Sequence, residues 1–256
     1  MNLQLIRNAT LKMKYAGKTI LVDPMLCEKE SMEPFMPGLN RNPTVGLTIS
    51  VEEIINGVDA VLVTHTHPDH FDQVSSDVLP KNIQLFSTPM DSDVFTTQGF
   101  KNVSVIEKMM DWKNIKITRI EGQHGSGKIL PFMGAVSGYV FQSIGEPTIY
   151  IISDSILIDT VKRAIKEFKP DIIVTNSGNG ILPGNEQYPV IMNEKQTIEV
   201  AKLAKQAIVI SVHLEAIDFN QGTRKSLAEF AHENGISKDQ LLIPMDGEKM
   251  DFEKRN

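Results

Sequence analysis

The sequence predicts an α/β fold built as a four-layer αββα sandwich, in which two β-sheets lie face to face between outer helices. The first part of the chain reads as short strands separated by turns, and the last third alternates helices with apolar strands. The sequence also shows no repeat, low-complexity tract or linker, which favours a single domain over residues 1–256.

Short strands open the chain. Residues 3–6, 10–15 and 19–22 alternate apolar and polar side chains with a period of two, which is typical of strands with one buried face. The turn between the second and third strands contains Gly17, so these two strands are expected to form a hairpin.

Residues 24–50 have a different character, because four prolines and Gly38 interrupt any regular element there. A long irregular stretch inside a compact domain is often functional. We expect a lid or a pocket wall, with an inert connector or a contact within a homo-oligomer as the equal alternative.

Regular elements continue from residue 59. Strands are expected at 60–63, 83–87, 103–106, 114–120, 137–141 and 148–152. Helices expected at 156–168, 193–205 and 223–234 then alternate with strands at 171–174, 207–212 and 241–243. Gly235 is placed to end the last helix, and His232 is interpreted as a structural residue that meets the dipole of that helix at its C-terminus.

The composition limits which classes of protein this chain can belong to. Apolar residues make up 41% of the 256, enough for a sizeable core, and the net charge of −6 argues against a nucleic-acid partner, which needs a basic face. No apolar run approaches the roughly 20 residues that span a bilayer, and the start lacks the features of a signal peptide. The single cysteine, Cys27, fits a reducing compartment, and we interpret it as an ordinary loop or core thiol. We therefore expect a cytoplasmic protein that acts on a small molecule, away from membranes.

Half of the six histidines lie in one short segment directly after the apolar run 60–63. His65 and His67 are two residues apart, so on extended backbone both side chains lie on the same side and can bind one ion. Asp69 and His70 follow at once and cannot easily reach that ion. They therefore indicate a second metal beside the first.

Three more side chains, His124, Asp154 and His213, each follow an apolar strand, where open α/β sheets gather their sites. Alternatives remain open for each of them. His124 can be a plain loop histidine, and His213 can be a buried core histidine whose nitrogens have hydrogen-bond partners within the protein. Asp154 can equally serve as the N-cap of the helix expected to begin near Ile156.

Together these residues resemble the metallo-β-lactamase superfamily of metal-dependent hydrolases, whose His-x-His-x-Asp-His signature they match over residues 65–70. The similarity runs over about residues 3–246 and implies the metallo-β-lactamase fold with a dinuclear metal centre. By this resemblance, His65, His67 and His124 hold the first metal, Asp69, His70 and His213 hold the second, and Asp154 bridges the two.

Within the superfamily the chain is most similar to the branch that contains the ascorbate-6-phosphate lactonase. Residues 20–24, 133–139 and 212–217 carry that similarity. Two positions depart from the pattern. Ser153 replaces the usual glycine before the bridging aspartate, and residues 217–220 lack a histidine that related sequences often carry. No distinct phosphate-binding loop is present, so the lactonase's substrate is not assigned.

The resemblance implies two divalent metal ions as cofactors. Zn²⁺ is the first choice, because iron-binding redox members place a carboxylate where His67 stands, and Mn²⁺ is the alternative. The expected activity is hydrolysis of a small-molecule lactone, ester or amide by a hydroxide that bridges the metals. Two alternatives are kept: a phosphodiesterase or nuclease on the same metal pair, and a non-hydrolytic metal-binding or redox protein.

Three side chains are given roles beside the metals. Asp69 is expected both to bind a metal and to orient the nucleophile. Asn176, which follows an apolar strand, is a candidate donor to the developing oxyanion, with a loop that favours Asn for backbone reasons as the alternative. Asp23 is a candidate acceptor for the N–H of a ligand imidazole, with a simple turn aspartate before Pro24 as an equal alternative.

Overall fold

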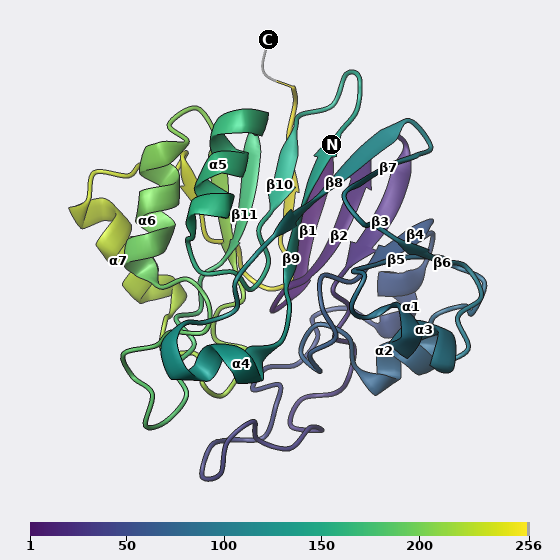
Figure 1. The fold of residues 1–256 in the computed structure, drawn as a ribbon. Helices are drawn as coiled ribbons and strands as arrows, with labels where there is room; N and C mark the ends of the chain where they lie inside the picture. Colours follow the sequence, from purple (N-terminus) through teal and green to yellow (C-terminus); the bar gives the residue numbers. More distant parts are fainter. Residues whose placement is uncertain (255–256) are drawn as a thin grey trace.

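The computed structural model describes residues 1–254 and contains two seven-stranded mixed sheets that stack face to face (Figure 1). The first sheet has the order β14 (Lys249–Asp251), β1 (Asn2–Arg7), β2 (Thr10–Tyr15), β3 (Lys18–Val22), β4 (Ala60–Leu62), β5 (Gln84–Ser87) and β6 (Val103–Val105). The second has the order β13 (Leu241–Leu242), β12 (Ile208–Val212), β11 (Ile172–Asn176), β10 (Ile149–Ile151), β9 (Ser137–Gln142), β8 (Ile115–Glu121) and β7 (Met109–Trp112).

Helices cover the outer faces of both sheets, which confirms the predicted αββα layers (Figure 1). The first sheet is covered by α1 (Val51–Ile55), α2 (Gln73–Val78) and α3 (Ser92–Thr97). The second is covered by α5 (Asp159–Phe168), α6 (Glu194–Leu203) and α7 (Arg224–Glu233). A 3-10 turn, η1 (Gly127–Ile129), and the short α4 (Leu130–Met133) lie in the loop after β8, at the lower end of the sheets in Figure 1.

Each sheet is antiparallel in one half and parallel in the other. Strands β3 to β6 of the first sheet and β10 to β13 of the second are parallel. Parallel strands end at one edge of their sheet, so the loops that follow β10, β11 and β12 lie side by side. This arrangement gathers the loops that carry the predicted ligands.

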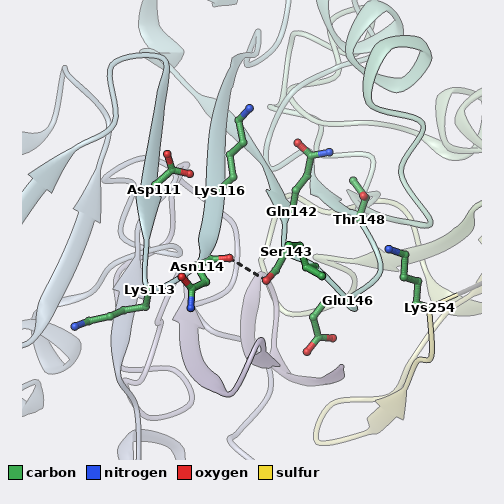
Figure 2. A pocket seen from close by; sticks show the side chains of 10 residues that line it. Asp111, Lys113, Asn114, Lys116, Gln142, Ser143, Glu146, Thr148 and Lys254 are labelled. Carbon is green, nitrogen blue, oxygen red and sulfur yellow. Dashed lines mark hydrogen bonds between the residues drawn. The ribbon is translucent and has the colours of Figure 1, made fainter.

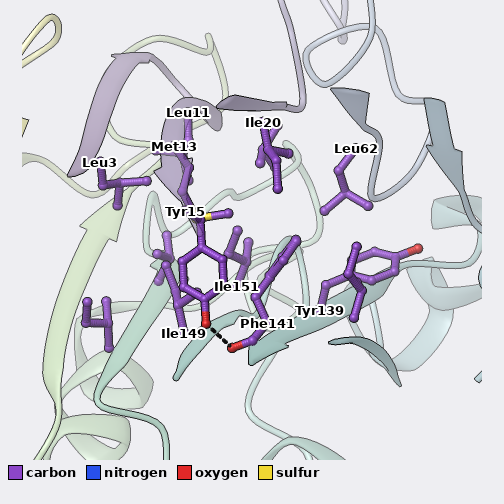
Figure 3. Close-up of a cluster of buried hydrophobic side chains, with 14 of the residues drawn as sticks. Leu3, Leu11, Met13, Tyr15, Ile20, Leu62, Tyr139, Phe141, Ile149 and Ile151 are labelled. Carbon is purple, nitrogen blue, oxygen red and sulfur yellow. Dashed lines mark hydrogen bonds between the residues drawn. The ribbon is translucent and has the colours of Figure 1, made fainter. Parts of the chain in front are cut away.

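The main core lies between the two sheets (Figure 3). Leu3 and Met13 of the first sheet and Ile149 of the second are fully buried there. The side chain of Tyr15 crosses this core, and its hydroxyl lies 3.2 Å from the carbonyl oxygen of Phe141. The polar end of this buried side chain therefore has a hydrogen-bond partner.

Most predicted strands, and the helices α6 and α7, agree with the structure to within two residues. The helix expected at 156–168 begins only at Asp159, and its N-cap Ile158 makes no side-chain hydrogen bond. The alternative that made Asp154 a helix cap was therefore wrong. Residues 24–50 form no helix or extended strand, as predicted, apart from one isolated bridge between Met32 and Asn42.

Seven short elements were not predicted: α1, α2, α3, η1, α4, β7 and β14. A signal for α1 was present, because Ser50 and Glu53 form a capping box at its start. Within the described residues, no helix is both long and apolar enough to cross a membrane.

Candidate metal centre

All seven predicted ligands converge at one end of the sandwich. His65 lies in the loop after β4 of the first sheet, whereas His124, Asp154 and His213 follow β8, β10 and β12 of the second. Their ligand atoms form two groups, within each of which all atoms lie within 4.8 Å of one another: His65, His67 and His124, then Asp69, His70, Asp154 and His213. All of these side chains are buried except His67, which is partly exposed.

One carboxylate oxygen lies between the two groups. Asp154 Oδ2 is 3.1 Å from Nε2 of His70 and 3.6 Å from Nε2 of His213 in its own group. The same oxygen is 3.5 Å from Nε2 of His124 and 3.8 Å from Nε2 of His65 in the other group. A single carboxylate oxygen thus faces the Nε2 atoms of four imidazoles. The lone pairs of these atoms repel one another unless cations or protons lie between them.

The outward nitrogens of two of these imidazoles are held by acceptors. His124 Nδ1 lies 2.7 Å from the carbonyl oxygen of Val190, and His70 Nδ1 lies 2.9 Å from Asp23 Oδ2. An N–H donated outward leaves the Nε2 lone pair directed at the centre. His70 Nε2 is buried and, although it lies 3.1 Å from Asp154 Oδ2, makes no hydrogen bond of normal geometry to any described residue, which fits a metal ligand. Asp23 thus contacts the imidazole of a predicted ligand, and its role as acceptor for that N–H stays a prediction.

The pKa values of the imidazoles suit cation binding. Burial lowers the pKa of His124 to about 4, and burial together with the nearby His70 lowers that of His65 well below its usual value. Both rings are therefore neutral, the form that binds a metal. For His70 and His213 burial acts in the same direction, but neighbouring carboxylates, Asp154 foremost, raise the pKa above its usual value. The carboxylates thus attract positive charge to the centre.

Asp69 is fixed from two sides. Its Oδ2 lies 3.0 Å from His213 Nε2, and its backbone carbonyl accepts a hydrogen bond from Asn8 Nδ2 at 3.2 Å. Burial raises the pKa of Asp69, but the imidazoles of His70 and His213 outweigh it and lower the value to about 2. The side chain is therefore a carboxylate at neutral pH.

Strained backbone surrounds the centre. Four non-glycine residues there have left-handed φ values: Asn8 at 56°, Asp23 at 45°, Ser153 at 64° and His213 at 60°. Such values are uncommon outside glycine and cluster at functional sites. Sequence reasoning missed Asn8 as a contributor, because its contact with Asp69 spans 61 residues and no local motif marks it.

Asn176 ends β11 beside Asp154, and its Nδ2 donates to Asp154 Oδ1 at 2.5 Å. The amide therefore holds the carboxylate that faces both groups, and its role as donor to an oxyanion stays a prediction. Asn220, in the segment that lacks the expected histidine, donates from Nδ2 to the carbonyl oxygen of His213 at 3.0 Å. It therefore supports the backbone of a predicted ligand.

Cys27 and His232 lie outside the two groups. Burial raises the pKa of Cys27 to about 11, which agrees with an unreactive thiol. His232 is exposed in the last turn of α7, which agrees with the structural interpretation.

A hollow of about 600 Å³ lies at the opposite end of the second sheet, beside the start of β8 (Figure 2). Lys113, Lys116 and Glu146 are among the residues that line it, and the two lysine side chains point in different directions in Figure 2. Glu146 is engaged by the N-terminal amine at 3.3 Å. The hollow therefore offers no convergent set of reactive groups.

Comparison with known proteins agrees with this geometry. Residues 2–213 match the family model of the β-lactamase superfamily domain. The UPF0173 protein YddR of Bacillus subtilis (strain 168) is 39% identical over 260 residues, covering 98% of this chain and 100% of that protein.

Two solved structures cover nearly the whole chain. The isothiocyanate hydrolase from Delia radicum gut bacteria has a TM-score of 0.92 and 36% identity, with 100% of both chains covered. A possible metal-dependent hydrolase from Veillonella parvula DSM 2008 has a TM-score of 0.93 and 30% identity, with 98% of both chains covered. The chain therefore has the metallo-β-lactamase fold and belongs to the metallo-β-lactamase superfamily, as a metal-dependent hydrolase of the UPF0173 family.

Proposed function

We propose that the protein hydrolyses a small organic substrate at an electrophilic carbon, and that an isothiocyanate is the first substrate to test. The observation that carries this proposal is the similarity to the isothiocyanate hydrolase, because it covers 100% of both chains and so includes the loops around the centre. The lactones, esters and amides expected from the sequence also present an electrophilic carbon and remain the second choice. A phosphorylated lactone tests the similarity to the ascorbate-6-phosphate lactonase.

The proposed metal ligands are the seven converging side chains. His65, His67 and His124 are assigned to one divalent cation, Asp69, His70 and His213 to a second, and Asp154 to both. The position of Asp154 Oδ2 between four imidazoles supports the shared role. Zn²⁺ is the first choice for both sites and Mn²⁺ the alternative. When bound, such ions supply Lewis acidity and lower the pKa of a bound water towards neutrality.

The hydrolysis balances with water alone. The oxygen of water bonds to the central carbon of R–N=C=S, the carbon–nitrogen bond breaks, and nitrogen receives both protons, which yields an amine and carbonyl sulfide. Asp69, ionised and fixed by its neighbours, is proposed to orient the water. His67 is the one partly exposed member of the two groups, so we place substrate entry on its side.

The test combines metal content with hydrolysis. The protein is assayed against an aralkyl isothiocyanate, a lactone, a phosphorylated lactone, an ester, an amide, a phosphodiester and short RNA. His65→Ala with His67→Ala should lose metal and activity together, whereas His232→Ala, a matched change of an exposed histidine, should keep both. Retention of both metals and full activity in the double variant would overturn the assignment. Nuclease activity that disappears with the ligand variants would instead favour the phosphodiesterase alternative.

Both sheets contribute to the centre, which supports the proposal that the chain works as one hydrolase domain. A cytoplasmic location, the lack of a nucleic-acid partner and a homo-oligomeric state stay predictions.

A further inference from the structure

Ser153 occupies a backbone position that suits glycine. It links β10 to Asp154, is buried, and has a φ of 64°. Glycine adopts this conformation freely, whereas a serine is strained there. The glycine usual in the superfamily would thus fit the backbone better, so the hydroxyl of Ser153 needs an explanation of its own.

That hydroxyl completes the hydrogen bonding of Thr64, which directly precedes the first predicted ligand. Ser153 Oγ donates to Thr64 Oγ1 at 2.7 Å. Thr64 Oγ1 in turn lies 2.8 Å from Asp23 Oδ2 and 3.2 Å from His65 Nδ1. A hydroxyl has one proton and two lone pairs, and a carboxylate only accepts. The Thr64 proton is therefore donated to Asp23, while its lone pairs accept the Ser153 O–H and the His65 Nδ1–H.

Asp23 extends the chain of hydrogen bonds to the other group. Its Oδ1 accepts the backbone N–H of Thr64 at 2.7 Å, and its Oδ2 accepts the Nδ1–H of His70 at 2.9 Å. His65 and His70 thus both carry a proton on Nδ1 and turn Nε2 towards the centre, where a bound cation would replace the second proton that the neighbouring carboxylates favour on His70. One belongs to each of the two groups, so a single buried network sets the tautomer of a ligand on both sides.

We propose that Ser153 is a positioning residue of the metal centre, which directs the Thr64 proton to Asp23 and thereby holds His65 and His70 in the tautomer that binds metal. A hydroxyl that accepts a hydrogen bond becomes a stronger donor, and the effect is larger in a buried site. Without the Ser153 proton, the Thr64 hydroxyl is a weaker donor to Asp23 and can turn its O–H towards His65 Nδ1. That ring would then carry its proton on Nε2, where it cannot bind a cation.

The experiment reads the tautomers and the metal affinity without any substrate. Ser153→Ala removes the hydroxyl and keeps the strain, whereas Ser153→Gly removes both. Each variant, labelled with ¹⁵N-histidine, is examined by imidazole NMR in the metal-free state, and Zn²⁺ affinity is measured against a competing chelator. Outer partners of ligands typically change metal affinity by about 10–100-fold. We expect about tenfold weaker Zn²⁺ binding in both variants, together with a second tautomer of His65.

Ser155→Ala is the matched control, because Ser155 flanks Asp154 on the other side and its hydroxyl contacts Gln123 N and the Ile156 carbonyl instead. It should lower thermal stability and leave the tautomers unchanged. Thr64→Val should abolish the network, with a loss of affinity of about 10–100-fold, and Thr64→Ser should restore it.

Two results would overturn the proposal. If Ser153→Gly leaves the tautomers and the Zn²⁺ affinity unchanged, the Ser153 hydroxyl only fills space. If Ser153→Ala changes them and Ser153→Gly does not, the change comes from backbone strain and not from the lost hydroxyl. The proposal rests on the metal ligands assigned above, but it fails separately from the hydrolysis. Wild-type protein that binds Zn²⁺ with the expected tautomers and cleaves none of the substrates would refute only the activity.

Discussion

Replacing Arg7 by methionine should release the irregular segment 24–50 from the sheet beside the metal centre. The side chain of Arg7, at the end of β1, is fully buried. Its Nη1 donates to the carbonyl oxygen of Val45 at 3.1 Å, and its Nη2 donates to those of Met25 and Cys27 at 2.9 Å each. One guanidinium therefore ties both ends of the segment to the first sheet.

The expected loss follows from these three contacts. A hydrogen bond from a charged donor contributes about 1.5–3 kcal/mol, so three give a gross contribution of about 5–9 kcal/mol. Burial of the guanidinium offsets part of this and lowers the pKa of Arg7. Methionine would regain apolar contacts, but three carbonyl groups would lose their donor. We expect the free energy of unfolding to fall by about 3–5 kcal/mol, a large share of the about 5–15 kcal/mol typical of a domain.

Urea unfolding measures the total loss in the free energy of unfolding, and amide hydrogen exchange shows which segment is destabilised. Exchange should accelerate over residues 25–45 more than in β9 or β11. Arg163→Met is the matched control, because Arg163 is exposed and the one hydrogen bond of its guanidinium to a described residue goes to the Thr160 hydroxyl, so its change should stay below about 0.5 kcal/mol. A loss below about 1 kcal/mol for Arg7→Met, with unchanged exchange in this segment, would refute the reasoning.

Three further changes test the centre and its surroundings. Asn176→Ala removes the donor to Asp154 Oδ1 and should weaken Zn²⁺ binding by about 10–100-fold in a chelator competition; unchanged affinity with a lower kcat would favour the oxyanion role instead. Gly178→Ala would place a Cβ 2.2 Å from the backbone oxygen of His213, so we expect a stability loss of about 1–3 kcal/mol and a lower zinc content, and a variant with wild-type urea unfolding would contradict this packing. Burial raises the pKa of Cys27 to about 11, so only about 0.1% of this thiol is thiolate at pH 8. Iodoacetamide should therefore label Cys27 far more slowly in the native protein than in the urea-unfolded protein, and the native rate should rise towards pH 11. Equal labelling rates by mass spectrometry would refute the protection of this thiol.

The sequence predicted the layers and the ligand positions because both depend on local patterns. The spacing of His65 and His67 and the apolar strand before them are visible within ten residues. The short helices α1 to α3 have five or six residues each, too few to show a helical period, so they were missed. Strand β14 was missed because it is stabilised by pairing with β1, at the opposite end of the chain.

Local patterns did not show which ligand nitrogen carries the proton: Asp23 was named as a candidate acceptor for an imidazole N–H, but neither its partner imidazole nor the acceptor for His124 could be identified from the sequence. Which nitrogen of an imidazole faces the centre depends on the acceptor at its other nitrogen. For His70 that acceptor is Asp23, 47 residues away, and for His124 it is the carbonyl oxygen of Val190, 66 residues away. Spacing places a ring near a metal, but only these distant acceptors leave the correct lone pair free.

Ser153 shows how such a distant contact changes the meaning of a substitution. By sequence it is a mild replacement of glycine that leaves Asp154 in place. In the folded chain it accepts backbone strain and reaches Thr64, 89 residues away. A strained residue persists only where its surroundings hold it, and here the compensation is a hydrogen bond to the network that orients two predicted ligands. The metal affinity of this protein should therefore depend on a residue that touches neither metal nor substrate.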